Sequence, residues 1–226
     1  RGIRGPAIVD AMIELGVSSS NVELSMSSVY AANRDRVDDA ADRHFLVRDG
    51  RRLPVSGGPD AGRPPVHPDH EERGRREIPV GDAVLLEPDD VPAAGERLWL
   101  KGCGPFRRTE TGLVATDDDI DAVREEGVPV VHWVPAEGSI PVRLRTPEGD
   151  VTGRAEPGLA DAADDEAFEV ERVGCARIDE AGAEPVADYA HPQRRCRTGL
   201  MMAAPSAADW RLPRVAPDPG RRGAAG

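Results

Sequence analysis

The chain has 226 residues, which is enough for one large domain or two small ones. An aromatic content of 4%, together with 24 glycines and 21 prolines, predicts small hydrophobic cores and many loops. Acidic residues outnumber basic ones by 41 to 29 and give a formal charge of -12, which argues against a generic, strongly basic nucleic-acid binder. Lys101 is the only lysine, and an acidic surface poor in lysine also suits a halophilic protein, because concentrated salt screens charge repulsion.

The cysteine content and the hydropathy of the chain indicate a cytoplasmic protein. Cys103, Cys175 and Cys196 are far apart and form no CxxC pair, so neither a disulfide framework nor a zinc site is expected. No apolar run approaches the length of a membrane span, and no signal peptide is recognisable, so no membrane partner is expected. Because the sequence begins with Arg1 rather than Met, we expect a piece of a longer protein or a processed chain.

Two helices are predicted at the N-terminus. The first follows Pro6, carries an apolar stripe at helical spacing and ends at Gly16. The second begins near Ser27, with Ser25 or Ser27 as its cap, and extends to about Ala41. Its interleaved Arg and Asp residues favour a solvated face with salt bridges over a binding face.

Short strands with turns between them are predicted for most of the remaining chain. The extended region begins at residues 44–47, whereas residues 50–65 and 153–165 have the composition of loops, and residues 117–126 that of a short acidic helix or turn. The predicted strands comprise a strand pair at 78–86, single strands at 98–100 and 113–115, an alternating strand at 167–179 and a last strand at 185–192. Such a pattern favours barrels over a sandwich, although pattern alone does not separate the two.

Residues 129–145, PVVHWVPAEGSIPVRLR, predict a β-hairpin around which the other strands would gather. An apolar run at 130–134 is followed by a turn at 136–139, and apolar residues then alternate with Pro141, Arg143 and Arg145. One face of this hairpin would be apolar and the other basic. A lone hairpin is only marginally stable, so we expect it to pair with further strands.

The last segment, residues 193–226, differs in composition from the rest. It carries seven Arg against two Asp, is rich in Gly, Pro and Ala, and lacks periodicity, which predicts disorder. A basic tail of this kind could contact RNA or a membrane surface, or it could be a segment that is not native to the protein.

The sequence contains no constellation typical of catalysis or of a metal site. His67 and His70 have HxxH spacing, but no third ligand is recognisable and Pro68 prevents a regular helix, which favours a pair of polar loop residues. His132 lies within an apolar strand pattern and is predicted to be a hydrogen-bonded core histidine. There is neither a phosphate-binding GxxxxGK[ST] motif nor a GxSxG motif. We therefore assign no catalytic residue and no metal ligand.

Five motifs in a fixed order resemble those of the C-terminal half of archaeal-type glutamyl-tRNA synthetases and, more distantly, of glutaminyl-tRNA synthetase. The motifs are HPDHEERGRREIPVGDAVLLEPDDVP (67–92), ERLWLKGCGPF (96–106), PVVHWVPAEGSIPVRLR (129–145), FEVERVGCARID (168–179) and YAHP (189–192). The N-terminal segment, with RGI at its start, LGV at the end of the first helix and NVELSMSSVYAANRDRVDDAADRHFLV at 21–47, is similar to the helical segment that follows the catalytic domain of these enzymes.

The resemblance covers residues 1–192 and implies a mainly β fold. It places a helical subdomain at 1–44 and two antiparallel β-barrels of the glutaminyl/glutamyl-tRNA synthetase anticodon-binding type at 45–192, followed by the disordered tail at 193–226. It also implies a class I aminoacyl-tRNA synthetase that joins glutamate to tRNA-Glu with ATP and Mg²⁺. The HIGH-like and KMSKS-like ATP-site motifs, which the family carries upstream of these segments, are missing here. We therefore expect no cofactor and no ligase activity in this chain alone.

The resemblance also points to basic residues that would contact tRNA. Arg76 in GRREIP stands where the related glutaminyl enzyme holds an anticodon-loop Arg, and Lys101, Arg107 and Arg108 follow the strand where the family places further basic contacts. Arg143 and Arg145 are added because they lie on the polar face of the predicted hairpin. Guanidinium planes can stack on unpaired bases and donate hydrogen bonds to them. For each residue, the alternative is a surface salt bridge in an acidic protein.

Two hypotheses follow. In the first, the chain is the tRNA-recognising part of a glutamate-tRNA ligase, a monomer that binds tRNA-Glu and also tRNA-Gln if the archaeal resemblance extends to both, but not DNA. In the second, it is a stand-alone β-barrel RNA-binding protein without a ligase role. An upstream open reading frame with the two ATP-site motifs would support the first, and a start codon immediately before Arg1 the second.

Overall fold

The computed structural model describes residues 2–16 and 24–193 of the chain. The described residues all belong to one compact unit. The tail predicted to be disordered therefore lies outside the described residues, except for Gln193. Within the described ranges, no helix is long and apolar enough to cross a membrane.

The two predicted N-terminal helices are confirmed. Helix α1 (Gly5–Leu15) has a proline in its first turn and ends at Gly16, whose φ is 70°. Helix α2 (Met26–Val37) begins after Ser25, whose side-chain oxygen accepts a hydrogen bond from the backbone N–H of Ser27. Helix α2 is shorter than predicted, because a 3₁₀ turn over Asp38–Ala40 replaces its expected last turn.

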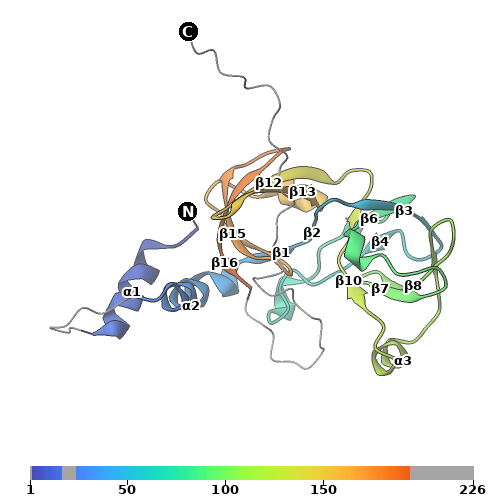
Figure 1. The fold of residues 1–226 in the computed structure, drawn as a ribbon, viewed down its shortest axis with the longest axis horizontal. Helices are drawn as coiled ribbons and strands as arrows, with labels where there is room; N and C mark the ends of the chain where they lie inside the picture. The colour runs from blue at the N-terminus through green and yellow to red at the C-terminus, as the bar shows by residue number, and fades with distance from the viewer. Residues whose placement is uncertain (1, 17–23, 194–226) are drawn as a thin grey trace, which may run out of the picture. The chain divides into compact units, whose positions relative to one another are not determined.

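Fourteen of the strands form two seven-stranded sheets, each curled into a barrel. The first barrel has the order β10 (Val130–Val131), β7 (Arg97–Leu100), β8 (Gly104–Arg108), β9 (Leu113–Ala115), β3 (Arg51–Ser56), β6 (Ala83–Leu86) and β11 (Val134–Pro135). The second barrel has the order β1 (Asp42–His44), β14 (Ala167–Val170), β15 (Gly174–Glu180), β16 (Val186–Pro192), β12 (Ile140–Thr146), β13 (Gly149–Ala155) and β2 (Leu46–Val47). Figure 1 shows the two groups of strands.

The mainly β fold with two barrels agrees with the prediction, but the barrels are not purely antiparallel. In the first barrel, β10 pairs with β7 and β3 pairs with β9 in parallel. In the second barrel, the parallel pairs are β1 with β14 and β12 with β16. The remaining neighbours in both sheets are antiparallel.

In each barrel, the two outer strands of the sheet are consecutive along the chain and are separated by only one or two residues. The outer strands of the second barrel, β1 and β2, are consecutive and are separated only by Phe45. The outer strands of the first barrel, β10 and β11, are likewise consecutive and are separated by His132 and Trp133. The first barrel is therefore inserted between β2 and β12 of the second. Strand β1 begins at Asp42, close to the predicted start of the barrels.

Each barrel has its own hydrophobic core. Trp133 is the largest fully buried side chain and lies in the core of the first barrel with Phe106 and Leu100. Phe168 and Ile178 lie in the core of the second barrel. A smaller apolar cluster, including Val37, joins the end of helix α2 to the second barrel. The small number of aromatic side chains in the two cores agrees with the aromatic content of 4%.

Several local predictions were wrong. The hairpin predicted at 129–145 does not form, since β11 pairs with β6 of the first barrel and β12 pairs with β13 and β16 of the second. The predicted loop at 50–65 contains β3 and β4 (Ala61–Gly62), and the predicted loop at 153–165 contains the end of β13 and a 3₁₀ turn over Pro157–Asp161.

The strand pairing within 78–86 was also wrong. Strand β5 (Ile78–Pro79) pairs with β4, whereas β6 pairs with β3 and β11. The alternating segment 167–179 is two strands, β14 and β15, rather than one. The strands predicted at 44–47, 98–100, 113–115 and 185–192 are confirmed, as is a short helix, α3 (Ile120–Glu125).

Candidate nucleic-acid interface

The six basic residues predicted to contact tRNA fall into three separate groups. Arg76 and Lys101 share partners at the place where the two barrels meet. Arg107 and Arg108 lie on β8 of the first barrel, and Arg143 and Arg145 lie on β12 of the second. The structure therefore does not bring all six into one patch, and the surroundings of each group differ.

The first group is built around a pair of stacked rings. Phe45, the residue that links β1 to β2, lies with its ring centroid 4.7 Å from that of His132, and the ring planes differ by only 13°. His132 is one of the two residues that link β10 to β11. The stack therefore joins the closing corner of one barrel to the closing corner of the other.

Arg76 lies against this stack and reaches two carboxylates. Its Cζ is 4.9 Å from the centroid of the Phe45 ring, which is cation–π distance. Its Nε lies 2.7 Å from Glu156 Oε1, and its Nη2 lies 3.8 Å from Glu171 Oε1. The Arg76 side chain is only 9% exposed, and those of Glu156 and Glu171 are 2% and 8% exposed. These are buried ion pairs rather than surface salt bridges.

Glu171 is the most heavily contacted carboxylate at this place. It forms an ion pair with Lys101, and His132 Nε2 lies 3.2 Å from its Oε2. Burial alone would raise the pKa of Glu171, but the hydrogen bond from His132 and the charges of His132 and Lys101 outweigh it, so the pKa lies well below its ordinary value. Burial lowers the pKa of His132, against the opposing effect of Glu171. The prediction of a hydrogen-bonded core histidine is confirmed, with His132 8% exposed.

Glu156 is held by partners from both barrels. His44 Nδ1 lies 2.9 Å from its Oε1, and the backbone N–H of Phe45 donates to its Oε2 over 3.0 Å. We call the seven residues that meet here the junction cluster: His44, Phe45, Arg76, Lys101, His132, Glu156 and Glu171. Its two permanent cations, Arg76 and Lys101, face two carboxylates, so the junction cluster offers little net charge to an outside anion.

The β12 group is also paired with carboxylates. Arg143 Nη1 lies 3.5 Å from Asp150 on the neighbouring strand, and both side chains are about half exposed. Arg145 Nε lies 3.0 Å from the buried Asp188, and Arg145 forms a second ion pair with Asp179. Their alternative interpretation as salt bridges in an acidic protein fits these contacts.

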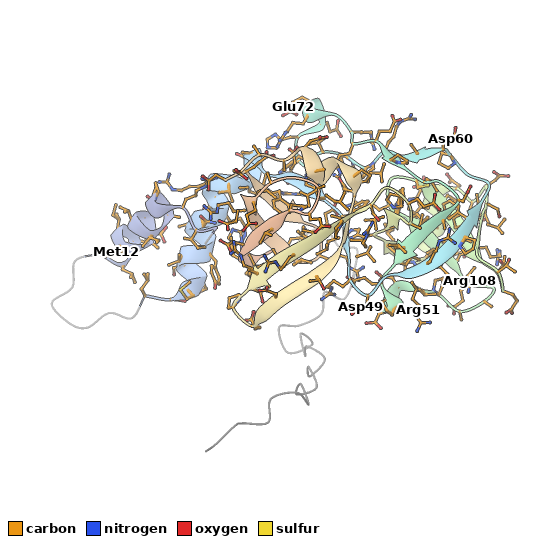
Figure 2. The ribbon with its side chains drawn as sticks, turned by 90° about the horizontal axis from the view of Figure 1, so that it is seen from above. Met12, Asp49, Arg51, Asp60, Glu72 and Arg108 are labelled. Atoms are coloured by element: carbon orange, nitrogen blue, oxygen red, sulfur yellow. The ribbon has the colours of Figure 1, made fainter. Side chains whose placement is uncertain are left out.

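The β8 group differs because its hydrogen-bond partners are carbonyl oxygens, although Arg107 also interacts electrostatically with Asp118. Arg107 Nη1 donates to the Gly95 carbonyl oxygen over 2.9 Å. Arg108 Nη1 donates to the carbonyl oxygens of Thr109 and Gly112. Among the described residues, no carboxylate oxygen lies within 4.0 Å of either guanidinium. Arg107 is exposed, and Arg108 lies at the periphery of the first barrel with Arg51 (Figure 2).

Arg75 is a further candidate that sequence reasoning missed. Residues 76, 78 and 80 turn inward, whereas Arg75 and Glu77 are exposed, as the two-residue period of an extended chain requires. Arg75 Nη1 donates to the carbonyl oxygen of Arg63, and Arg63 in turn forms an exposed ion pair with Glu77 at 3.2 Å. The buried Ile78 was the available signal, because it places Arg76 on the inner face and Arg75 on the outer one.

Metal-binding side chains and cavities are the other features of the described residues that bear on function. Among those residues, no group of three or more His, Cys, Asp or Glu side chains could hold a metal ion. A cavity of about 550 Å³ lies beside α3, and its charged lining consists of Asp89, Asp90, Glu96, Arg97 and Glu126. An acidic lining of this kind repels the phosphates of a nucleic acid.

Comparison with known proteins connects this architecture to one family. Residues 41–124 match the family described as tRNA synthetases class I (E and Q), anti-codon binding domain. The matched residues include β1 and β2 of the second barrel, β3, β6, β7, β8 and β9 of the first barrel, and the junction residues from His44 to Lys101.

Curated relatives match a longer part of the chain. A glutamate--tRNA ligase of Natronomonas pharaonis is 62% identical over 193 residues, which cover 85% of this chain and 34% of that protein. A glutamate--tRNA ligase of Halobacterium salinarum is 57% identical over 208 residues, with 85% and 36% coverage. One from Methanosarcina acetivorans is 37% identical over 195 residues, with 84% and 34% coverage. The chain thus spans about a third of the length of the curated relatives it matches.

Proposed function

We propose that the chain is the tRNA-anticodon-binding part of a glutamate-tRNA ligase, because residues 41–124 match the anticodon-binding domain family of the class I tRNA synthetases (E and Q). The observation that carries this proposal is the 62% identity to such a ligase over 85% of this chain. The whole protein would attach glutamate to tRNA-Glu in the cytoplasm, with tRNA-Gln as a second substrate, and would act as a monomer.

The chemistry of the ligase would lie outside this chain. The support is that the match covers only 34% of the Natronomonas pharaonis ligase and includes its anticodon-binding domain family, whereas attaching glutamate to tRNA requires ATP and Mg²⁺. The role of this chain would be to bind tRNA and hold it in register while the reaction takes place at the distant acceptor end. Such positioning contributes to catalysis by lowering the entropy cost of bringing the reactants together.

The arginines without carboxylate partners are the best candidates for contact with tRNA. An Arg that is bound only to carbonyl oxygens keeps its full positive charge for a phosphate or a base, whereas an ion-paired Arg must first give up its carboxylate. Arg107, Arg108 and Arg75 meet this condition among the described residues. Arg143 and Arg145 would contribute only if the RNA displaced their aspartates, and Arg76 and Lys101 would act from within the protein.

Equilibrium binding to tRNA tests the proposal. The full chain, in about 2 M KCl so that nonspecific attraction is screened, is titrated with a tRNA-Glu transcript and with the same transcript carrying a different anticodon. We expect a preference for the native anticodon that falls when Arg107 and Arg108 are both changed to alanine. Arg36→Ala is the matched control, because Arg36 is an exposed cation paired with Asp10 on the helices. Equal affinity for the two transcripts would contradict the proposal.

A further inference from the structure

We propose that the junction cluster is a latch that fixes the two barrels in one relative orientation, and that Glu171, Arg76 and Lys101 are its positioning residues. Its bearing on tRNA rests on the proposed function, because the latch would hold the RNA-contacting surfaces of the two barrels at a set distance. The proposal assigns Arg76 a role in the interior of the protein, which differs from the contact with an anticodon base that the resemblance implies.

The charges of the junction cluster are sorted by barrel. Arg76, Lys101 and His132 all come from the segment that builds the first barrel, whereas the second imidazole, His44, lies on β1 and contacts Glu156 within the second barrel. The carboxylates come from the second barrel, where Glu156 follows β13 and Glu171 follows β14. Every ion pair that the first three residues make with these carboxylates therefore crosses from one barrel to the other. Complementary charges on opposite sides of an interface fix its register and disfavour other arrangements.

Two further ion pairs reinforce the same boundary. Arg48, which follows β2, lies with Nε 2.8 Å from Oε1 of Glu87, which follows β6. Arg172, in the turn after β14, pairs with Asp90, the last residue of the 3₁₀ turn that follows β6. In both of these pairs the cation follows a strand of the second barrel, which is the opposite polarity to the ion pairs of Arg76 and Lys101 in the junction cluster. A sliding motion of one barrel against the other would break contacts of both polarities at once.

Burial makes the junction cluster difficult to open. Separating Arg76 from Glu156 and Glu171 would leave carboxylates that are 2% and 8% exposed without their cation, and an unpaired buried charge is strongly destabilising. The stacked Phe45 and His132 rings would also lose their contact. An RNA base could bind Arg76 only if both of these contacts were lost, whereas the preceding residue, Arg75, is already exposed.

The substitution Glu171→Gln distinguishes the latch from a direct role of Arg76 and Lys101 in RNA binding, because the two hypotheses predict opposite changes in the affinity for tRNA. If Arg76 and Lys101 contact RNA directly, removing the negative charge beside them frees both cations and tightens binding. If the junction cluster is a latch, the loss of its central carboxylate loosens the barrels and weakens binding, by roughly 2- to 30-fold for a change in positioning of this kind. The matched control is Glu77→Gln, which removes an exposed carboxylate on the same segment and should not weaken binding.

The test combines this binding measurement with the distance between the barrels. Two fluorophores are introduced into the full chain through unnatural amino acids at the exposed Thr111, in the β8–β9 turn, and Glu148, in the β12–β13 turn. We expect a single narrow distance distribution in the wild type and in Glu77→Gln, and a broader one in Glu171→Gln. Lys101→Met should broaden it as well, and Lys101→Arg should restore it, which keeps the test decisive if Glu171→Gln does not fold.

These measurements distinguish failure of the latch proposal from failure of the proposed tRNA-binding function. An unchanged distance distribution in Glu171→Gln and Lys101→Met would overturn the latch, as would tighter tRNA binding by Glu171→Gln. If the wild-type chain bound no tRNA at all, the proposed function would fall, and the distance distributions would still decide whether the junction cluster holds the barrels together.

Discussion

At the scale of single residues, burial determines the charge state of the histidines. Burial lowers the pKa of His67, of His132 and of His191 below the ordinary value of 6.5. For His132 the carboxylate of Glu171 opposes this effect, and for His191 the Pro192 carbonyl oxygen does so, but in both cases burial has the larger effect. All three are therefore neutral in the folded protein at neutral pH.

The neutral state of these three buried imidazoles predicts how the stability of the folded protein depends on pH. The folded protein takes up protons on these three imidazoles at a lower pH than the unfolded chain does, so stability is present above pH 6.5 and is lost as the pH falls below it. Each unit of pKa difference corresponds to about 1.4 kcal/mol. Urea unfolding in about 2 M KCl at successive pH values from neutral downward should show a falling free energy of unfolding.

The exposed His70 provides the control for this prediction. Hydrogen bonds from its ring to Asp39 and Glu72 raise its pKa, so it contributes in the opposite direction, with stability that is present below pH 6.5. His70→Gln should therefore leave the loss of stability at low pH intact or make it steeper. A free energy of unfolding that stayed constant through this pH range would show that the buried imidazoles do not control the transition.

At the scale of elements, the segment 129–145 shows what sequence patterns can and cannot determine. Its alternation correctly marks extended chain, and its buried residues were identifiable, but Trp133 enters the first core whereas Val142 and Leu144 enter the second. Local periodicity carries no information on which partner a strand will choose, because pairing depends on residues far away in sequence. The helices were predictable because their signals, Pro6, Gly16 and Ser25, act within a few residues.

The candidate site, like the strands, was only partly predictable from the sequence. The resemblance drew attention to the basic residues of both barrels, and the structure places each of them at a barrel surface or junction. What the sequence could not reveal was the partner of each cation, since Glu156 and Glu171 are distant from Arg76 in the chain and close to it only after both barrels have formed. Their assignment as tRNA contacts stays a prediction.

The turn after β7 provides a test at this scale. Gly102 has a φ of 75°, and a Cβ placed there would overlap the backbone of Pro64, against which this turn packs. Gly102→Ala should therefore lower the free energy of unfolding by roughly 2–5 kcal/mol, from left-handed strain together with overpacking. Gly138, with a φ of 87° and open space around it, is the control, and Gly138→Ala should cost only about 1–2 kcal/mol. Equal losses in the two variants would mean that the turn can move away from Pro64.

At the scale of the whole molecule, the excess of acidic residues governs behaviour in salt. A formal charge of -12 on 226 residues produces repulsion that favours expansion of the chain. The range of this repulsion is about 8 Å at physiological ionic strength and about 3 Å in 1 M salt. The match to ligases of Natronomonas pharaonis and Halobacterium salinarum agrees with the salt-adapted character that the composition predicts.

We therefore expect the midpoint of urea unfolding to rise as KCl is increased from about 0.2 M to about 2 M, because screening removes repulsion that is strongest in the compact state. A variant with the exposed Glu110, Asp117 and Glu184 changed to their amides should need less salt to reach the same midpoint. A midpoint that does not depend on the KCl concentration would show that charge repulsion does not limit the stability of the folded protein.

The central claim, that this chain binds the anticodon region of tRNA, is tested most directly by footprinting. The full chain is bound to a tRNA-Glu transcript in about 2 M KCl, and the backbone is cleaved with hydroxyl radicals along its whole length. We predict protection confined to the anticodon stem and loop, which the Arg107→Ala, Arg108→Ala double variant reduces and Arg36→Ala does not. Protection centred on the acceptor stem, or spread evenly over the tRNA, would contradict the claim.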